Sequence, residues 1–385
     1  MWLRMWLRKF RLILEQSLDR APLNRGSYYA LLPSFAWLLS GFYGLGVWFH
    51  QWLYQIGALK AYRPALPVIC VGNITTGGSG KTPVTIALAT YFLEKGQRVA
   101  VLSKGYRAKK TAQGHRADSP DYGDEPFLIQ QRLPAVTVLV GSSRKQNLEK
   151  LTREGNTDVV IIDDGFQHHA VKAAVNLVLV DRHQGLGNGK LLPSGPLRDF
   201  PERLNQAHAV WLTGMQPLSG AAVLETPAIT TLRHDYPELN HRLDSVSICT
   251  EGWISLEKWP SASSKENILP SEAFSGKSVA LFTTFARPER MKTWLLQSGV
   301  DVQEHRLLPD HEPVSCDDTQ WLKTMIQQEF PVLVSEKDAV KLLFLREDSA
   351  LAGIIPMIWV LKIQAVLPIA ALERCLSGSV CEVSA

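Results

Sequence analysis

The sequence has few cysteines and no pairing among them. Five cysteines are scattered over 385 residues, and no two form a CxxC pair. An odd and dispersed set supports neither a disulfide framework nor a zinc site, and it favours a reducing cytoplasm. Long basic runs are also missing, and a formal net charge of +4 is too small to indicate nucleic acid, although it suits an anionic ligand or an acidic membrane surface. We therefore expect no nucleic-acid partner, and the sequence points to no protein partner.

Charged residues are absent between Gly26 and Leu59. The stretch is long enough to cross a bilayer if it forms one continuous helix. Pro33 and several glycines interrupt it, however, its Trp and Tyr residues are spread along it, and basic residues flank both ends. We therefore expect residues 1–60 to form an apolar membrane-associating segment, as an interfacial hairpin or amphipathic anchor. A helical pair buried against the rest of the chain is the alternative, and the run does not fit a signal peptide.

The chain after this segment alternates short β-branched runs with longer helical patterns, which is typical of a mostly parallel sheet covered by helices. The length favours two domains. In the first domain, residues 61–215, we expect strands at 68–72, 98–103, 136–140, 158–163, 176–181 and 209–214, with helices after Lys81, Asp124 and Ser142.

A polar stretch with Pro and Gly follows residue 214 and indicates crossing strands or a hinge. Beyond it we expect strands at 277–285, 301–308, 331–335 and 355–367, with helices from Pro288 and near Asp317. Residues 216–385 are therefore predicted to form a second, smaller α/β domain. No internal repeat or low-complexity segment is present.

The stretch VGNITTGGSGKTP, which starts at Val71, is close to the phosphate-binding pattern GxxxxGK[ST], but Thr75 stands at the position of the first glycine. The other parts are present: a β-rich run before the loop, glycines whose amides can turn inward, Lys81 to reach the β- and γ-phosphates, and the Thr82 hydroxyl to bind Mg²⁺. A ligand-free Gly-rich turn is the alternative, but a GKT ending is rare there. We predict a nucleotide site at Thr75, Thr76, Gly77, Gly78, Ser79, Gly80, Lys81 and Thr82.

An apolar strand that ends in acids supplies the second half of such a site. In DVVIIDDGFQHH, Asp163 follows the strand directly and Asp164 stands beside it. Two adjacent carboxylates fit Mg²⁺, although Asp-Asp-Gly is also ordinary turn chemistry. We predict Thr82, Asp163 and Asp164 as metal ligands. The neighbouring His168 and His169 lack further ligands in register, and such pairs sit more often at a surface.

Six motifs follow the loop in order along the chain. They are SKGYR from Ser103, GDEP from Gly123, DDGFQH from Asp163, GNGKLLPSGPLRD from Gly187, PDHEP from Pro309 and SEKDAVK from Ser335. Together with the loop they resemble the tetraacyldisaccharide 4'-kinases, the lipid A 4'-kinases of Gram-negative bacteria. The resemblance extends from the N-terminal apolar segment to about Leu342. Members of this family commonly lack the first loop glycine, so Thr75 lies within their pattern.

The resemblance implies a membrane-associated kinase that uses Mg²⁺ and moves the γ-phosphate of ATP to the 4'-hydroxyl of a tetraacylated glucosamine disaccharide 1-phosphate, forming lipid IVA. It implies an α/β fold, P-loop NTPase-like, with a mostly parallel sheet, helices on both faces, a smaller C-terminal α/β domain and an N-terminal apolar helical anchor. The implied partners are the lipid substrate and the lipid surface, at the cytoplasmic face of the inner membrane.

Catalytic roles follow from the same resemblance. Asp124 of GDEP would accept the proton of the acceptor hydroxyl, and His311 of PDHEP would work with it, alongside Lys81. Because His311 lies in the second domain, closure between the domains would complete the site. On the residues alone, Asp124 and His311 are also suited to cap helices, as is Asp338 of SEKD.

Substrate contacts are expected from the basic residues of the motifs. Lys104, Arg107 and Arg198 suit the 1-phosphate of the lipid or the phosphates of ATP, and Glu125 and Asp199 are further candidates. Asp199 stands where the family more often has Glu followed by Pro, which leaves its role open. TFARPER in place of a GIGNP-like turn, and DHEP in place of DHH, also depart from the pattern but leave the phosphate chemistry intact.

Two other classes of protein fit a phosphate loop. A regulatory ATPase would release phosphate without an acceptor, whereas a kinase would be accelerated by the lipid. A membrane-tethered scaffold with a vestigial site would transfer no phosphate. The joint presence of Lys81, Thr82, Asp124, Asp163 and His311 favours the kinase over the scaffold.

Overall fold

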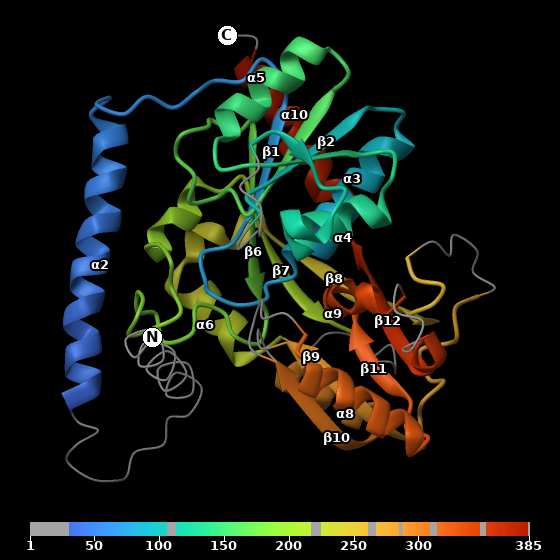
Figure 1. The fold of residues 1–385 in the computed structure, drawn as a ribbon. Coiled ribbons are helices and arrows are strands. Elements are labelled where there is room, and N and C mark those ends of the chain that lie inside the picture. The colour runs from blue at the N-terminus through green and yellow to red at the C-terminus, as the bar shows by residue number, and fades with distance from the viewer. Residues whose placement is uncertain are drawn as a thin grey trace.

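The computed structural model describes residues 31–105, 113–216, 225–260, 267–284, 288–308, 314–346 and 352–383. A twelve-stranded sheet runs through this part of the chain in the order β10-β9-β11-β12-β8-β7-β6-β1-β5-β2-β4-β3 (Figure 1). Its strands are β1 (Val68–Gly72), β2 (Val99–Ser103), β3 (His115–Arg116), β4 (Thr137–Val140), β5 (Val159–Asp163), β6 (Val175–Asp181), β7 (Ala209–Met215), β8 (Leu243–Ser255), β9 (Ser278–Thr284), β10 (Asp301–Leu308), β11 (Val332–Ser335) and β12 (Ile358–Val366). The α-helices are α2 (Leu31–Gln55), α3 (Lys81–Glu94), α4 (Asp124–Arg132), α5 (Arg144–Glu154), α6 (Pro227–Asp235), α7 (Pro288–Gln297), α8 (Cys316–Gln327), α9 (Glu336–Leu342) and α10 (Ile369–Val383).

Strand direction reverses in the middle of the sheet. Apart from the short edge strand β3, the strands from β4 to β8 run parallel, and so do those from β12 to β10, but β12 pairs antiparallel with β8. β8 pairs with β7 only as far as Ile248, opposite Met215, and then continues beyond it along β12. The carboxyl ends of the two parallel sets therefore face each other. We call β1–β7 with their helices the first half and β9–β12 with theirs the second half.

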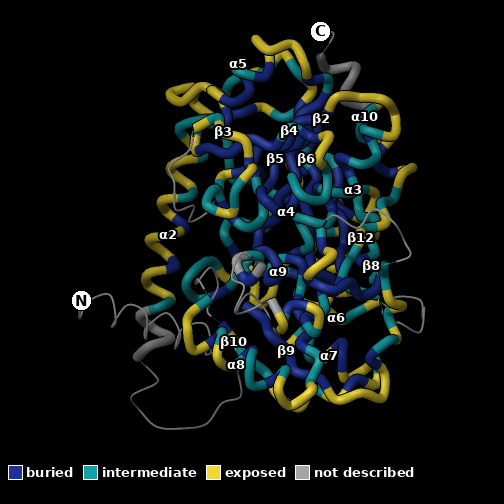
Figure 2. The backbone as a smooth tube through the Cα atoms, turned by 45° about the vertical axis from the view of Figure 1, so that its right-hand side comes forward, coloured by how far each residue is buried: buried dark blue, intermediate teal, exposed yellow. Residues whose placement is uncertain are grey.

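Helices cover both faces of the first half. Side chains of a strand alternate between faces, and in β1 Ile69 packs with Leu88 of α3 and Leu372 of α10, whereas Val68 packs with Leu148 of α5. β1, β2 and β5 are buried along their whole length, as expected for β-branched runs in the middle of a parallel sheet (Figure 2). The predicted α/β fold with a mostly parallel sheet and helices on both faces is confirmed.

α2 is one helix of 25 residues that stands beside the sheet (Figure 1). Pro33 lies in its first turn, where a proline removes no helical hydrogen bond, and the helix continues through Gly41, Gly44 and Gly46. The predicted interfacial hairpin is therefore wrong for this stretch. Gly44 faces the body of the protein, since a Cβ there would lie 2.9 Å from Leu191 Cδ1. In the described part of the chain, no helix combines the length and the apolar character needed to cross a membrane.

Every strand and helix predicted for the two α/β units is present in the structure. The sequence did not predict β8, α6 or α10. β8 mixes polar and apolar residues over 13 positions without regular alternation and contains Gly252 at a φ of 134°, so neither an alternating pattern nor a continuous apolar run marks it. The predicted division at residue 216 falls directly after β7. The sheet continues across this point through β8, and the division into domains stays a prediction.

Candidate active site

The loop between β1 and α3 has the backbone of a phosphate cradle. Gly77 and Gly80 adopt φ angles of 97° and 77°, which favour glycine, and Gly80 is the N-cap of α3. Thr75 instead forms an antiparallel bridge with Leu197 and has no positive φ. A glycine is therefore not required at this position, which gives a physical reason for the departure of the loop from the usual pattern.

The segment around Pro196 and Arg198 is hydrogen-bonded to the loop. The amide of Thr76 donates to Pro196 O at 2.7 Å, and the amide of Arg198 donates to Ile74 O at 2.7 Å. On the other side, the hydroxyl of Thr213 at the end of β7 donates to Ser79 O at 2.9 Å. These bonds fix the loop backbone without using the amides of Gly77 to Lys81, in keeping with the capture of an anion at a helix N-terminus.

Asp164 binds two cationic side chains beside the loop. It follows β5 with a φ of 53°, and its carboxylate lies 3.5 Å from Lys81 Nζ and 3.0 Å from Arg198 Nη1. Burial alone would raise the pKa of Asp164, but the charges of Lys81 and Arg198 and their hydrogen bonds lower it overall. The structure thus brings together three of the predicted site residues: the loop lysine, the second acid of DDG and the arginine of PLRD.

Asp163 has a different environment. Its side chain is 2% exposed, and its Oδ1 accepts a 3.3 Å hydrogen bond from Thr85 of α3. Burial raises the pKa of Asp163 to about 7, with further contributions from the negative charges of Glu125 and Asp164. A carboxylate in this position is ionised more readily when a cation lies beside it.

A magnesium ion fits such a place, because Mg²⁺ keeps several waters and is usually held by one or two carboxylates together with substrate phosphates. Among the described residues, no group of three or more His, Cys, Asp or Glu side chains is arranged to hold a metal. Asp163 and the half-buried Thr82 are therefore the side chains that fit this limited mode of coordination best, because Asp164 is engaged by Lys81 and Arg198.

The acids of GDEP begin α4. Gly123, with a φ of 118° and Gly105 Cα 3.3 Å from where its Cβ would be, turns the chain into the helix, so that Asp124 and Glu125 occupy the first turn. Acids at this end of a helix are favoured by the exposed amides. α4 contacts α3, and the charge of Glu125 acts on Asp163, so Glu125 lies near the acids that follow β5.

Two side chains of the second half also reach the site, and the sequence did not predict either contact. Arg290 of α7 donates to Gly78 O at 3.0 Å and lies 2.5 Å from the buried Asp181 at the end of β6. Lys337 of α9 lies 3.1 Å from Glu125. The spacing of neither residue indicates such a contact, which depends on the facing carboxyl ends of the two strand sets.

The remaining predicted residues lie in varied places. Lys104 is exposed directly after β2. Asp199 is buried and accepts hydrogen bonds from Gln51 of α2 at 2.6 Å and from the amide of Phe200 at 2.8 Å, and the bond from Gln51 helps to hold α2 to the body. The substrate contacts proposed for Lys104 and Asp199 stay predictions. Arg107 and His311 lie outside the described residues.

Asp338, His168 and His169 each had a structural alternative in the sequence, and the structure shows where they lie. Asp338 accepts from the amide of Thr284 at 3.1 Å and shares the cap of α9 with Ser335, as its capping pattern suggested. His168 and His169 are half-buried and not at an open surface, because His169 packs against Tyr54 of α2 with ring centroids 5.5 Å apart.

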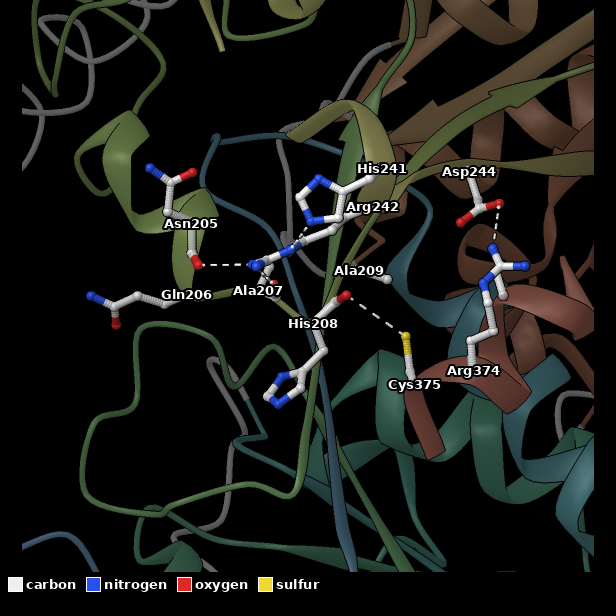
Figure 3. Close-up of a pocket in the computed structure, with 11 residues that line it drawn as sticks. Asn205, Gln206, Ala207, His208, Ala209, His241, Arg242, Asp244, Arg374 and Cys375 are labelled. Atoms are coloured by element: carbon white, nitrogen blue, oxygen red, sulfur yellow. Dashed lines mark hydrogen bonds and ion pairs between the residues drawn. The ribbon is translucent and has the colours of Figure 1, made fainter. Parts of the chain in front are cut away.

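A cavity lies at the other end of the sheet. It has a volume of about 490 Å³ and lies at the amino ends of β7 and β8, beside α10 (Figure 3). Its arginines are already engaged: Arg242 donates to Asn205 O and Ala207 O at 3.0 and 2.9 Å, and Arg374 lies 3.6 Å from Asp244. This cavity shares no residue with the phosphate loop, and its cations are committed to protein acceptors.

Comparisons with known proteins identify the family of the chain. The family model for tetraacyldisaccharide-1-P 4'-kinase matches residues 32–380. The tetraacyldisaccharide 4'-kinase of Mannheimia succiniciproducens is 33% identical over 327 residues, which cover 83% of this chain and 87% of that protein. The enzyme of the same name from Halorhodospira halophila is 34% identical over 307 residues, covering 79% of this chain and 82% of that protein.

A solved structure shows the same fold. The crystal structure of LpxK from Aquifex aeolicus in complex with ATP superimposes with a TM-score of 0.66 at 24% identity, covering 90% of this chain and 99% of that chain. The fold, the order of the motifs and the match along most of the sequence lead to one conclusion. The chain belongs to the tetraacyldisaccharide-1-P 4'-kinase family.

Proposed function

We propose that this protein transfers the γ-phosphate of ATP to the 4'-hydroxyl of a tetraacylated glucosamine disaccharide 1-phosphate, a step of lipid A biosynthesis. Family membership supports this reaction. The observation that supports it in the structure is the position of α4: with Asp124 and Glu125 in its first turn, it contacts α3, and the charge of Glu125 acts on Asp163. A loop that only bound nucleotide would not require a second set of acids here.

The loop supplies the ATP site in this proposal. Backbone amides of the glycine turn hold the phosphates, and Lys81 reaches the β- and γ-phosphates. Asp164 keeps Lys81 and Arg198 beside the loop, 3.5 and 3.0 Å from its carboxylate, ready to bind anionic oxygens. Thr82 and Asp163 hold Mg²⁺, which when bound offsets the negative charge of the phosphates.

Asp124 is the base for the acceptor. A sugar hydroxyl is a poor nucleophile, and a carboxylate within hydrogen-bond reach takes its proton as the new bond forms. The 4'-oxygen bonds to the γ-phosphorus while the bond from that phosphorus to the β,γ-bridging oxygen breaks, so ADP leaves and Asp124 gains the proton. His311 assists Asp124, and Lys104, Arg107, Glu125, Arg198 and Asp199 form the proposed set of substrate contacts.

α2 places the enzyme at the lipid surface. The side chains that hold it to the body lie on one stripe: Ser40 donates to Leu191 O at 2.7 Å, Tyr43 to Arg198 O at 2.8 Å and Gln51 to Asp199. The opposite face exposes Trp37, Leu38, Phe42, Leu45, Trp48, Phe49 and Trp52. An apolar, aromatic face of this kind suits the boundary of a bilayer. We therefore propose a location at the cytoplasmic face of the inner membrane.

One experiment tests the reaction directly. Purified protein with Mg²⁺, ATP and a tetraacylated disaccharide 1-phosphate in mixed micelles is expected to yield a lipid heavier by one phosphate, detected by mass spectrometry. ADP release should depend on the lipid. Rapid release of inorganic phosphate without lipid, and no heavier lipid product, would contradict the proposal and indicate an ATPase.

A further inference from the structure

The helix that carries Asp124 is shared between the two halves of the protein. Ile129 of α4 packs into the core of the first half with Val101 and Val140. Phe127 and Leu128 pack instead into the core of the second half. α4 begins at the candidate base, so its orientation depends on contacts from both halves.

The C-terminal end of α4 is tied to the second half by buried charges. Arg132 Nη1 donates to both carboxylate oxygens of Glu336 at 2.6 and 2.7 Å, and Arg132 Nη2 donates to Glu251 at 3.2 Å. The side chains of Arg132 and Glu336 are 11% and 6% exposed. Trp259 Nε1 donates to Glu336 at 3.2 Å, and Lys362 lies 2.9 Å from Glu251, so two acids face two bases. Removal of any one of these charged side chains would leave a buried charge without its partner and would strongly destabilise the fold.

The N-terminal end of α4 is tied by the next residue of the same segment. Lys337 Nζ lies 3.1 Å from Glu125, which follows Asp124 directly. Asp338, one residue further, faces its own half, where it accepts from the amide and hydroxyl of Thr284 at 3.1 and 2.8 Å. Successive residues of SEKD thus hold the two ends of α4 and anchor the segment to β9.

We propose that Glu336 and Lys337 are positioning residues that hold α4 at both ends and so set the place of Asp124 at the phosphate loop. This rests on the proposed function. Capping of α9 needs only Ser335 and Asp338, and does not explain why the two residues between them reach α4. A helix of nine residues is about 13 Å long, so release of one end lets it pivot about the other. Shifts of about 1 Å at a reacting group cost up to about a hundredfold in rate.

Lys337→Met in the full chain is the first test, because its partly exposed side chain can change without disturbing the core. We expect kcat for the lipid to fall by about tenfold or more, with KM for ATP and affinity for ATP within about twofold of the original. Lys337→Arg should restore most of kcat, because it keeps a cation within reach of Glu125. Lys145→Met, which breaks the exposed Lys145–Glu149 pair on α5, is the matched control and should change neither constant.

Hydrogen exchange gives a readout that does not depend on activity. Amides of α4 are expected to exchange faster in Lys337→Met and in Glu336→Gln, while those of α5 stay unchanged. Unchanged kcat and unchanged α4 exchange in Lys337→Met would overturn the proposal, as would a loss of kcat that parallels a loss of ATP affinity or of thermal stability. If the unsubstituted protein fails to phosphorylate the lipid, the proposed reaction is wrong, and the exchange experiment still decides whether Glu336 and Lys337 hold α4.

Discussion

α2 and α4 both border the candidate site, but they are attached to the rest of the protein by different means. α2 contacts the segment that carries Arg198 through a few polar bonds, and most of its large side chains face outward. α4 is short, lies between two cores and is tied at both ends by ion pairs.

The difference follows from what each helix has to position. A reacting carboxylate tolerates little displacement, so it requires a helix whose packing allows one orientation. A membrane-facing helix needs an apolar surface and a secure but modest attachment. Changes at α4 should therefore alter turnover, and changes at α2 should alter lipid access.

The largest effect is expected at the start of α4. Asp124→Asn keeps the shape of the side chain but removes the proton acceptor, so kcat should fall by at least about a hundredfold, while ATP affinity changes little. Radiolabelled phosphate transfer to the lipid and fluorescence titration with an ATP analogue measure the two quantities. Gln131→Ala on the same helix is the control. Full turnover by the Asp124→Asn protein would show that Asp124 is not the base, and α4 would then have no reacting group to position.

A smaller effect on turnover, but a clear one on membrane binding, is expected from the outer face of α2. Trp37, Phe42 and Leu45 are 68%, 65% and 59% exposed. Their combined replacement by Ser should lower partition into vesicles by about tenfold or more, since each would bury apolar area in the boundary of the bilayer. Thermal stability should hardly change, because these side chains are exposed already. Vesicle sedimentation measures the partition.

The control for this face is another exposed apolar pair. Leu296 and Leu307 are 52% and 40% exposed on the second half, and their replacement by Ser should leave partition unchanged. Equal loss of vesicle binding in both variants would indicate that any exposed apolar side chain contributes to binding. It would then contradict a specific role of α2 at the membrane.

The same comparison shows what the sequence could predict. Strands such as β1 and β5 were evident because buried parallel strands are continuous apolar runs, and the loop was evident because a Gly-rich stretch that ends in GKT comes after such a strand. The irregular mixture of polar and apolar residues in β8 gave no strand pattern, although β8 joins the two halves, and the glycines of α2 suggested interruptions that do not occur. The low helix propensity of glycine does not break α2, because one stripe of the helix packs on the body of the protein. Gly44 allows a close approach to Leu191 there.

The candidate site was predictable only in part. Lys81, Asp163 and Asp164 lie in local motifs that fix both residue type and spacing, and the structure brings them together at the loop. The ion pair of Lys337 with Glu125 joins residues 212 positions apart, and no local pattern marks it. Contacts of this kind depend on the facing ends of the two strand sets, which only the register of β8 with β7 and β12 determines.

A modest effect is expected where α2 meets the site segment. Gln51 donates at 2.6 Å to Asp199, whose pKa burial raises. Gln51→Ala removes this bond from a buried carboxylate and should cost about 1–3 kcal/mol of stability, with a few-fold rise in KM for the lipid. Urea denaturation and kinetics in mixed micelles measure both. Gln55→Ala, at the exposed end of α2, should change neither, and identical behaviour of the two variants would mean that the Asp199 contact does not hold the helix.

The smallest effect concerns the pH dependence of the attachment of α2. His169 packs between His50 and Tyr54, with ring centroids 5.4 and 5.5 Å away. Burial lowers the pKa of His169 to about 4 from 6.5, and the charges of Arg203, His50 and His168 add to this. The folded protein therefore favours the neutral ring, and stability is lost as the pH falls from about 6.5 to about 4.

His169→Phe keeps a ring but takes up no proton, so its stability relative to the original protein should increase as the pH falls through this interval. Urea denaturation at pH 7, 5.5 and 4 measures the trend, with His115→Phe, an exposed ring stacked on Tyr122, as the control. A constant difference between His169→Phe and the original protein at all three pH values would show that the contact between α2 and the body does not depend on this proton.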